Sequence, residues 1–361
     1  MNRNLKLFLA IDHPANVHYF KNFIFMMKNR GHTVNVIARD KEVTLRLLDF
    51  YKIPYVNRGK GANSLFGKFL DIITTDLKIF INALKFKPDY FISFGSMNMG
   101  HISFLLNKPH FCFDDTEHNK LNHIMYMPFT KHVITPYTFK KNMGKKHIKI
   151  NAMMEFGSIH PNYFKPNKSI FEYLDLEMNE KYILLRFISW NAIHDRGQRG
   201  LSMSDKIDAI NELSKFGKIF ISSEDELPEK LNKYKINIPP EMMHDALYFS
   251  SLFYGESGTM AVEAALLGTP AVRISTLAKH LGNFTELNEK YSLLYHYDCP
   301  KKGIDMALNI LSDPESKINW VNKAKKFFKE KIDLNLFMLW FFENYPKSKD
   351  IYNISIKKFK L

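Results

Sequence analysis

Short apolar runs alternate with helical patterns along almost the whole chain, and this alternation limits the possible folds more than any other feature. The runs are rich in β-branched and aromatic residues, and most are followed by apolar residues at the spacing of an amphipathic helix. A repeated strand–helix–strand pattern predicts parallel sheets with helices on their faces. The predicted strands are Lys6–Ile11, Thr33–Ala38, Tyr55–Asn57, Tyr90–Phe94, His110–Phe113, His132–Thr135, Tyr182–Phe187, Lys218–Ser222, Leu252–Gly255, Ala271–Ile274 and Ser292–His296.

The segment Phe156–Asn167 interrupts the alternation, because glycine, prolines and polar residues gather there without periodicity. A chain of 361 residues is also longer than one hydrophobic core usually organises. We therefore expect an α/β protein of two Rossmann-like, doubly wound domains, residues 1–160 and 161–320, with a cleft between them. Residues 321–361 are expected to form helices that cross back to the first domain. In such sheets ligands bind beyond the carboxyl ends of the strands, so the loops that follow strands are the candidate sites.

The charge balance narrows the range of partners. Lys and Arg number 51 against 37 Asp and Glu, which gives a formal net charge of +14. A basic surface favours nucleic acid, anionic lipid or phosphorylated small molecules, and a general lysine bias is the alternative explanation. The sequence contains no zinc-finger spacing, aromatic RNP-type strand motif or basic leucine heptad. Nucleic acid is therefore not expected as a partner.

The cysteine count and the lengths of the apolar runs indicate in which cellular compartment the protein is expected. Cys112 and Cys299 are the only cysteines, so the sequence offers no disulfide framework and no cysteine-based metal site, which fits a reducing cytoplasm. No apolar run reaches the roughly 18 residues that would span a bilayer. We expect a cytoplasmic protein with no metal ion.

The stretch GESGTMAVE joins a predicted strand to a predicted helix. The first turn of a helix presents unpaired N–H groups and a partial positive charge, and Gly258 has no side chain that would keep a phosphate away. Ser257 and Thr259 can cap the helix or donate hydrogen bonds to phosphate oxygens. Glu263 follows one turn later, on a face that a ribose attached to the phosphate would reach. With Glu256 these residues form a candidate nucleotide site, and a capped helix with a solvated glutamate is the alternative.

Carboxylates and imidazoles follow two predicted strands of the first domain. The stretch IDHPANVH places Asp12 beside His13, and a neighbouring carboxylate raises the basicity of an imidazole. The stretch DDTEHN includes Asp115 and Glu117, and crowded carboxylates can act as acid and base or bind a divalent cation. All four residues are candidate catalytic groups. Helix capping by Asp12 or Asn16 and a solvated acidic turn are the alternatives.

The loop ISWNAIHDRGQRGLS follows the first strand of the second domain. Trp190 can stack on a base or a sugar. His194 is a candidate for proton transfer, and Arg196 and Arg199 are candidates for neutralising phosphate charge. Two glycines would allow the loop to become ordered when a ligand binds. A surface loop with incidental charge is the alternative.

These motifs together resemble a known family. IDHPANVHYFKN, NRGHTVNVIARDKEVT, FGS, FDDTEHN, the loop from Trp190 to HDRG, and GESGTMAVEAALLGTPAV occur in the order typical of the family catalogued as domain of unknown function 354. The resemblance covers roughly residues 5–310. It implies a GT-B-like fold, related to glycosyltransferases and to UDP-N-acetylglucosamine 2-epimerases, and a role in surface polysaccharide synthesis.

GESGTMAVEAALLGTPAVRI is similar to the nucleotide-sugar loop of those enzymes. The resemblance implies that Ser257, Gly258 and Thr259 bind the diphosphate of UDP and that Glu263 binds its ribose. It also places Glu117 and the loop with His194 where the epimerases have catalytic segments. Thr259 stands where the epimerases have a second glycine, and Val262 where they have a paired glutamate, which favours a transferase over an epimerase.

The leading functional hypothesis is a glycosyltransferase that uses a nucleotide-diphosphate sugar, with UDP as the expected nucleotide, and a saccharide or lipid-linked acceptor. The product would belong to capsule, lipopolysaccharide or exopolysaccharide, and the reaction would need no cofactor and no obligatory metal. Basic residues of the second domain would offset charge on the leaving diphosphate, while a base of the first domain would deprotonate the acceptor hydroxyl across the cleft. A 2-epimerase-like enzyme and a non-catalytic binding scaffold are the alternatives.

The end of the chain suggests a peripheral membrane contact. Lys323–Lys331 is strongly basic and Leu334–Phe342 is strongly apolar, so the two together could lie on the anionic inner face of a membrane, where lipid-linked acceptors are presented. The alternative is a final helix that packs its apolar face onto the protein and leaves the lysines in solvent.

Overall fold

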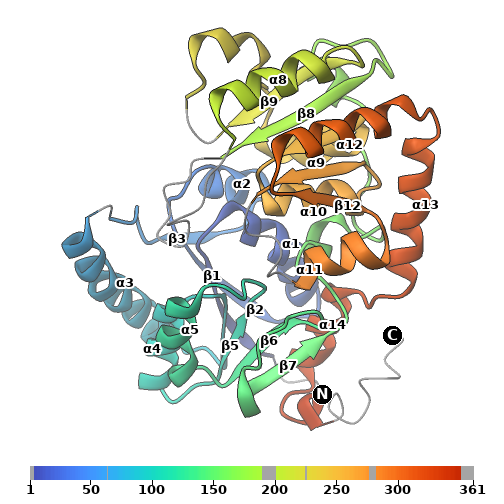
Figure 1. Ribbon diagram of the computed structural model, residues 1–361. Coiled ribbons are helices and arrows are strands. Elements are labelled where there is room, and N and C mark those ends of the chain that lie inside the picture. Colours follow the sequence, from blue (N-terminus) through green and yellow to red (C-terminus); the bar gives the residue numbers. More distant parts are fainter. Residues whose placement is uncertain (1–3, 63, 189–200, 224–225, 276–281, 351–361) are drawn as a thin grey trace. The chain divides into compact units, whose positions relative to one another are not determined.

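A computed structural model describes residues 4–62, 64–188, 201–223, 226–275 and 282–350 (Figure 1). The chain divides into two compact units, of which the first contains residues 1–160 and 331–361 and the second contains residues 161–330. Each unit has one sheet whose strands are all parallel, with helices between consecutive strands. The α/β class predicted from the alternation of strands and helices is therefore confirmed.

The sheet of the first unit has seven strands in the order β3-β2-β1-β4-β5-β6-β7. The order reverses between β1 and β4, and the carboxyl ends of those strands are where a doubly wound sheet binds ligands. β7 lies outside the predicted strands, because only every second residue of HIKI is buried, as at the edge of a sheet. The strands are β1 (Lys6–Ile11), β2 (Thr33–Ala38), β3 (Tyr55–Asn57), β4 (Tyr90–Phe94), β5 (His110–Phe113), β6 (His132–Pro136) and β7 (His147–Ile150).

Helices follow the strands of the first unit. The first helix starts at Pro14, because proline is well tolerated in the first turn of a helix. The helical segments are α1 (Pro14–Asn29), α2 (Thr44–Phe50), α3 (Leu65–Phe86), α4 (Met97–Leu105), α5 (Lys120–Tyr126), η1 (Met127–Phe129), η2 (Gly144–Lys146), α6 (Phe156–Ile159) and α14 (Leu334–Glu343).

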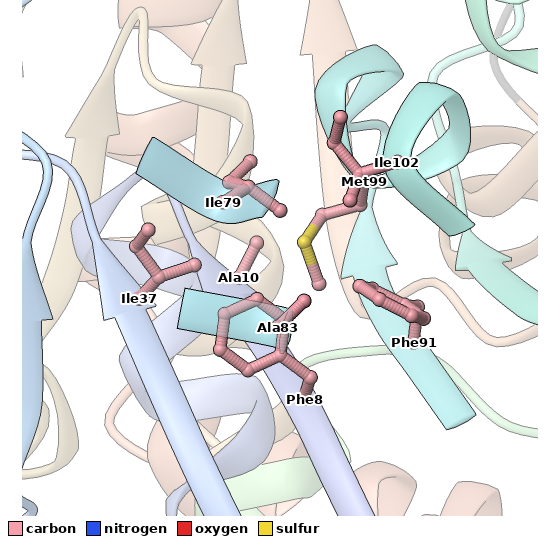
Figure 2. Close-up of a cluster of buried hydrophobic side chains, with 8 residues drawn as sticks. All are labelled: Phe8, Ala10, Ile37, Ile79, Ala83, Phe91, Met99 and Ile102. Carbon is pink, nitrogen blue, oxygen red and sulfur yellow. The ribbon is translucent and has the colours of Figure 1, made fainter. Parts of the chain in front are cut away.

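An apolar cluster between the first sheet and helices α3 and α4 anchors the central strands (Figure 2). Phe8 and Ala10 alternate along β1 and so lie on one face of the sheet. The Phe8 ring meets the Phe91 ring of β4 edge to face, with 5.6 Å between the ring centroids. Burial of each large side chain stabilises the fold by about 1.5–3 kcal/mol, so the strands that carry the candidate loops are firmly held. The cluster consists of Phe8, Ala10, Ile37, Ile79, Ala83, Phe91, Met99 and Ile102.

Helix α14 completes the first unit from the far end of the sequence. Its Phe342 packs against Phe23 of α1 and Phe111 of β5, at ring-centroid distances of 5.6 and 5.0 Å. Gly157 lies so close to α1 that a Cβ there would come within 2.1 Å of the Tyr19 carbonyl oxygen. The carbonyl of Gly157 accepts a hydrogen bond from Asn335 of α14 at 3.1 Å. The glycine therefore lets α1, α6 and α14 meet.

The sheet of the second unit has five strands in the order β12-β11-β10-β8-β9, which reverses between β10 and β8. β12 begins later than predicted, because Ser292 has a φ of 50° and lies in a turn before the strand. The strands are β8 (Tyr182–Phe187), β9 (Lys218–Ser223), β10 (Leu252–Gly255), β11 (Ala271–Ile274) and β12 (Leu294–Tyr297). The helical segments are α7 (Ile170–Tyr173), α8 (Met203–Leu213), η4 (Glu229–Tyr234), η5 (Pro240–Met242), α9 (Met243–Phe249), α10 (Gly258–Leu266), α11 (Gly282–Thr285), η7 (Glu286–Lys290), α12 (Pro300–Ser312) and α13 (Ser316–Lys329).

The C-terminal segment leaves the second unit later in the chain than predicted. Helix α13 belongs to the second unit, where the indole of Trp320 donates a hydrogen bond to the carbonyl of Leu293 at 2.7 Å. The return to the first unit therefore begins at Lys331 and not at residue 321. Most apolar side chains of α14 are buried in the first unit, with Phe337, Phe341 and Phe342 all 0% exposed, whereas Leu336 is 38% exposed. The buried side chains therefore do not form the membrane-facing surface considered for Leu334–Phe342. Among the residues described, no helix combines the length and the apolar character needed to cross a membrane.

Candidate functional site

Asp12 follows β1 and is held by an arginine of the same unit. Its Oδ1 accepts a hydrogen bond from Nε of Arg58 at 3.0 Å, and the Arg58 side chain is only 8% exposed. A second nitrogen of Arg58 donates to the hydroxyl of Thr75 at 3.0 Å. The backbone N–H of Asp12 donates to the side chain of Asn16 at 3.2 Å. These contacts join β1, the loop after β3 and α3, so the Asp12 carboxylate has a structural partner.

His13 is the N-cap of α1. Its Nδ1 accepts a hydrogen bond from the backbone N–H of Ala15 at 3.2 Å. An accepting Nδ1 leaves the proton of the neutral ring on Nε2, which lies 3.8 Å from a carboxylate oxygen of Glu42. In this arrangement His13 presents a donor at Nε2 and has no lone pair there to take a proton. The pairing of Asp12 with His13 as a base stays a prediction.

Asp114, the first residue after β5, organises the acidic loop. Its carboxylate accepts hydrogen bonds from the backbone N–H of Thr116 at 2.8 Å and from the hydroxyl of Tyr126 at 2.6 Å. Nε2 of His123 lies 3.1 Å from the same carboxylate. Nδ1 of His123 accepts a hydrogen bond from the ammonium of Lys141 at 2.7 Å, which places the proton of the neutral ring on Nε2. Asp114 therefore fixes the loop to α5 and is itself 2% exposed.

Asp115 and Glu117 stand on the turn that Asp114 holds. Oδ1 of Asp115 accepts a hydrogen bond from the hydroxyl of Thr116 at 3.0 Å, and the side chain remains partly exposed. Burial, together with the negative charges of Asp114 and Glu117, raises the pKa of Asp115 to about 7. Glu117 accepts a hydrogen bond from the backbone N–H of Lys140 at 3.3 Å. The loop thus holds a carboxyl group that changes its charge near neutral pH.

The neighbouring loop of the first sheet is tied to this acidic loop. Asn122 of α5 donates a hydrogen bond to the carbonyl of Gly95, directly after β4, at 2.8 Å. Gly95 has a φ of +61°, a conformation that side chains other than glycine rarely adopt. Because β4 and β5 are neighbours in the sheet, this bond holds their two loops at the same edge.

In the second unit, the loop after β10 enters α10 at the reversal of the strand order. Ser257 is the N-cap of α10, and its hydroxyl accepts a hydrogen bond from the backbone N–H of Met260 at 3.4 Å. Ser257, Gly258 and Thr259 are all partly exposed. The N-terminus of a helix that starts at such a reversal is a natural site for an anion. The structure therefore brings these three predicted residues together.

Glu256 was predicted to contact a nucleotide, but its carboxylate is buried and bonded to the backbone of its own unit. Its side chain is 0% exposed, and its two oxygens accept hydrogen bonds from the backbone N–H groups of Ile188 at 3.2 Å and Leu201 at 2.7 Å. Ile188 and Leu201 are the described residues on either side of residues 189–200. Glu256 thus joins the start of the loop after β8 to its end. Trp190, His194, Arg196 and Arg199 lie outside the described residues.

Glu263 lies one turn into α10, as predicted, but its carboxylate is turned toward α9. Oε1 of Glu263 is 3.2 Å from Nε2 of His244, and the two side chains are 6% and 7% exposed. The reason is that α10 buries residues Ala261 to Leu266 against its neighbours, so Glu263 has little access to solvent. Its role as a ribose ligand stays a prediction.

Arg273 of β11 is a site residue that the sequence analysis did not single out. Its Nε donates a hydrogen bond to the carbonyl of Glu256 at 3.1 Å, and its guanidinium carbon lies 4.5 Å from the ring centroid of Phe284. A Cβ built on Gly258 would lie 3.6 Å from that guanidinium. A lone arginine in the otherwise apolar strand AVRI is a usable signal, because charged side chains are rarely buried without a reason.

Within the described part of the chain, no group of three or more His, Cys, Asp or Glu side chains is arranged to hold a metal ion. Each unit offers its own chemistry: the first has a carboxyl group with a raised pKa after β5, and the second has a helix N-terminus beside an arginine. The first arrangement can accept or donate a proton. The second can bind an anion.

Comparison with known proteins shows the family and the fold. A family model described as "Protein of unknown function (DUF354)" matches residues 5–334. An uncharacterized protein of Methanocaldococcus jannaschii is 22% identical over 282 residues, which are 74% of this chain and 81% of that protein.

Several solved structures share the fold. A complex of S. aureus MnaA with UDP matches with a TM-score of 0.68 and 11% identity, over 95% of this chain and 97% of that chain. The UDP-GlcNAc 2-epimerase from Neisseria meningitidis bound to UDP-GlcNAc matches at 0.64 and 12%, over 90% and 99%. The glycotransferase of kitacinnamycin matches at 0.61 and 9%, over 94% and 99%. These likenesses confirm the predicted GT-B-like fold.

Proposed function

This chain belongs to the family described as "Protein of unknown function (DUF354)", and from that premise we propose that it is a glycosyltransferase with a nucleotide-diphosphate sugar as donor. The observation that carries the proposal is the start of α10 at the reversal of strand order in the second sheet, where Ser257, Gly258 and Thr259 are partly exposed. Backbone N–H groups and the helix dipole at that point suit a diphosphate. Two of the structural neighbours are complexes with UDP or UDP-GlcNAc, which supports UDP as the first nucleotide to test.

In the proposed reaction the second unit binds the donor and the first unit supplies the base. The first turn of α10 stabilises the negative charge that develops on the diphosphate as the bond from the sugar to the phosphate oxygen breaks. Asp115 of the first unit takes the proton of the acceptor hydroxyl while that oxygen bonds to the anomeric carbon. A carboxylate whose pKa is about 7 is a stronger base than an ordinary aspartate and is still largely ionised above neutral pH.

Ligand binding tests the donor assignment directly. We expect the unfolding temperature of the full chain to rise with one class among UDP-, GDP-, CMP- and dTDP-sugars, because a ligand that binds only the folded state stabilises it. Uridine serves as the control for UDP, since it has the base and ribose but no phosphate. A protein that none of these nucleotide sugars stabilises would contradict the proposal.

An epimerase-like reaction is the second candidate, and the acidic loop is the observation that favours it. Asp115 and Glu117 place two carboxyl groups on one turn, one of them with a raised pKa, and an epimerase must remove and return a proton at a sugar carbon. Incubation with UDP-N-acetylglucosamine in D2O without acceptor separates the two reactions. Deuterium at C2 of the sugar, seen by NMR, would identify the epimerase, and an unlabelled sugar would favour the transferase.

A further inference from the structure

Arg273 is buried at the carboxyl edge of the second sheet. Its side chain is 5% exposed, and it belongs to β11, which pairs with β10 so that Arg273 stands opposite Gly255. The hydrogen bond from its Nε to the carbonyl of Glu256 and the contact with Phe284 fix the plane of the guanidinium. The charge is therefore held in one place and does not move with a flexible side chain.

The same guanidinium has hydrogen-bonding capacity that the described residues do not use. Nη1 of Arg273 is buried and has no hydrogen-bond partner among the residues described. Burial lowers the pKa of Arg273 to about 10, and the nearby charge of Glu256 only partly opposes this effect. A buried N–H donor without a hydrogen-bond partner is costly, and an anion bound to Nη1 would remove that cost.

The position of Arg273 relative to α10 points to the kind of anion. A Cβ built on Gly258, the first residue of α10, would lie 3.6 Å from both Cζ and Nη2 of Arg273. The guanidinium is thus beside the helix N-terminus, where backbone N–H groups and the partial positive charge of the helix already favour an anion. A Cβ there would also lie 3.2 Å from the Phe284 ring, so glycine at position 258 lets the guanidinium and the ring lie this close to the helix N-terminus.

We propose that Arg273 binds the phosphate group that occupies the N-terminus of α10, with Nη1 and Nη2 as donors. The inference rests on the proposed function in taking that phosphate to be the diphosphate of a nucleotide sugar. Arginine suits this task because its planar, always charged fork matches the geometry of a phosphate. Binding would satisfy a donor that the free protein leaves unused.

The experiment measures Kd by calorimetry for UDP, inorganic pyrophosphate and uridine on the full chain. We expect Arg273→Gln to weaken the binding of UDP and of pyrophosphate by about 10- to 100-fold, the loss typical of a charge-assisted hydrogen bond. Uridine should bind equally to both proteins. Lys302→Gln removes the same charge from an exposed position on α12 and should leave all three affinities unchanged.

The ratio of UDP affinity to uridine affinity separates a ligand from a structural role. If Arg273 only braces the backbone of Glu256, the Gln variant unfolds at a lower temperature but keeps that ratio, and the inference is overturned. If Arg273→Gln does not fold, the same affinities are measured for Arg273→Lys. Lysine keeps the charge but loses the fork, so UDP affinity should fall severalfold, and an unchanged affinity overturns the inference.

The three ligands also distinguish this inference from the proposed function. UDP that binds the wild type and the Gln variant equally overturns the role of Arg273 and leaves the donor assignment standing. Pyrophosphate binding that depends on Arg273, without any binding of UDP, supports the anion site and contradicts a UDP-linked donor. A wild-type protein that binds neither UDP nor pyrophosphate contradicts both.

Discussion

The loop after β5 and the loop after β10 both follow interior strands at the carboxyl edge of a parallel sheet, yet they have opposite electrostatic character. The first gathers the carboxylates of Asp114, Asp115 and Glu117. The second presents a helix N-terminus beside the guanidinium of Arg273. The same place in the fold therefore carries clustered carboxylates in one sheet and a helix N-terminus beside a guanidinium in the other.

The two loops also differ in what they do with a carboxylate. Asp115 is partly buried beside the negative charges of Asp114 and Glu117, and burial together with these charges raises its pKa. Glu256 is fully buried and accepts two backbone N–H groups, so its charge is used to hold the protein together. A carboxylate at the edge of a sheet is therefore reactive or structural according to its neighbours.

The largest expected effect is on the first loop. Asp115→Asn removes the proposed base and should lower turnover by about 100- to 10,000-fold, while UDP binding changes little because the anion site is intact. The wild-type rate should also fall about tenfold for each pH unit below the pKa near 7, since only the ionised carboxylate accepts a proton. A steady-state pH profile of the wild type and single-turnover rates of the variant test both expectations.

Asp208→Asn is the matched control for Asp115→Asn, since it makes the same chemical change at an exposed position on α8. It should leave the rate and its pH profile unchanged. A variant with asparagine at position 115 that keeps more than about a third of the wild-type rate would remove Asp115 from the mechanism.

The next effect concerns the buried carboxylate of the second loop. Glu256→Gln leaves one oxygen to accept a hydrogen bond and turns an amide N–H₂ toward the N–H of Ile188 or Leu201. We expect this mismatch to cost about 1–3 kcal/mol of stability and to lower the unfolding temperature in calorimetry. Glu172→Gln, at an exposed position on α7, should have no such effect. Equal unfolding temperatures for the two variants would show that the Glu256 carboxylate is not structural.

A smaller effect is expected at the anion site proposed for the second loop. Gly258→Ala would place a Cβ 3.2 Å from the ring of Phe284 and between the helix N-terminus and Arg273. UDP affinity should fall about tenfold, since the methyl group occupies space that a phosphate needs, whereas uridine affinity should not change. Titration calorimetry with both ligands tests this, and an equal loss for both would show a general distortion of the loop.

The smallest effect tests the cause of the raised pKa in the first loop. Glu117→Gln removes one of the negative charges that raise the pKa of Asp115, so the acidic limb of the rate profile should move to lower pH by less than about one unit. The comparison needs the full profile and not a rate at one pH. A limb that stays in place, or moves to higher pH, would show that the charge of Glu117 does not act on the base.

Strands and helices could be predicted from the sequence where a few neighbouring residues are enough to specify them. Buried parallel strands such as β1 and β10 are short, nearly unbroken apolar runs, and the serine and glycine before α10 mark a helix start. Strand β7 was not predicted, because an edge strand buries only one face and its lysine and histidine interrupt the apolar run.

The sequence was enough to predict which loops carry the candidate residues. It was not enough to predict which side chains contact one another in the folded protein. Position along the chain places Asp115 and Ser257 after strands, but the partners of Glu256 lie 68 and 55 residues away. The pairing of Glu263 with His244 likewise depends on how α10 packs on α9, which apolar periodicity alone does not specify. The lone arginine of AVRI marks Arg273 as unusual, but its position next to the loop after β10 follows only from the pairing of β11 with β10.

The docking of α14 onto the first unit has a consequence for how the protein is made. The N–H of Ile332 donates to the carbonyl of Asn151 at 3.1 Å, so the chain leaves the first unit and returns to it at nearly the same place. A ribosome completes all of the second unit before it reaches the residues that cover Phe23 and Phe111. The nascent first unit therefore has exposed aromatic rings throughout the synthesis of the second, and any chain that stops before residue 331 would leave them uncovered.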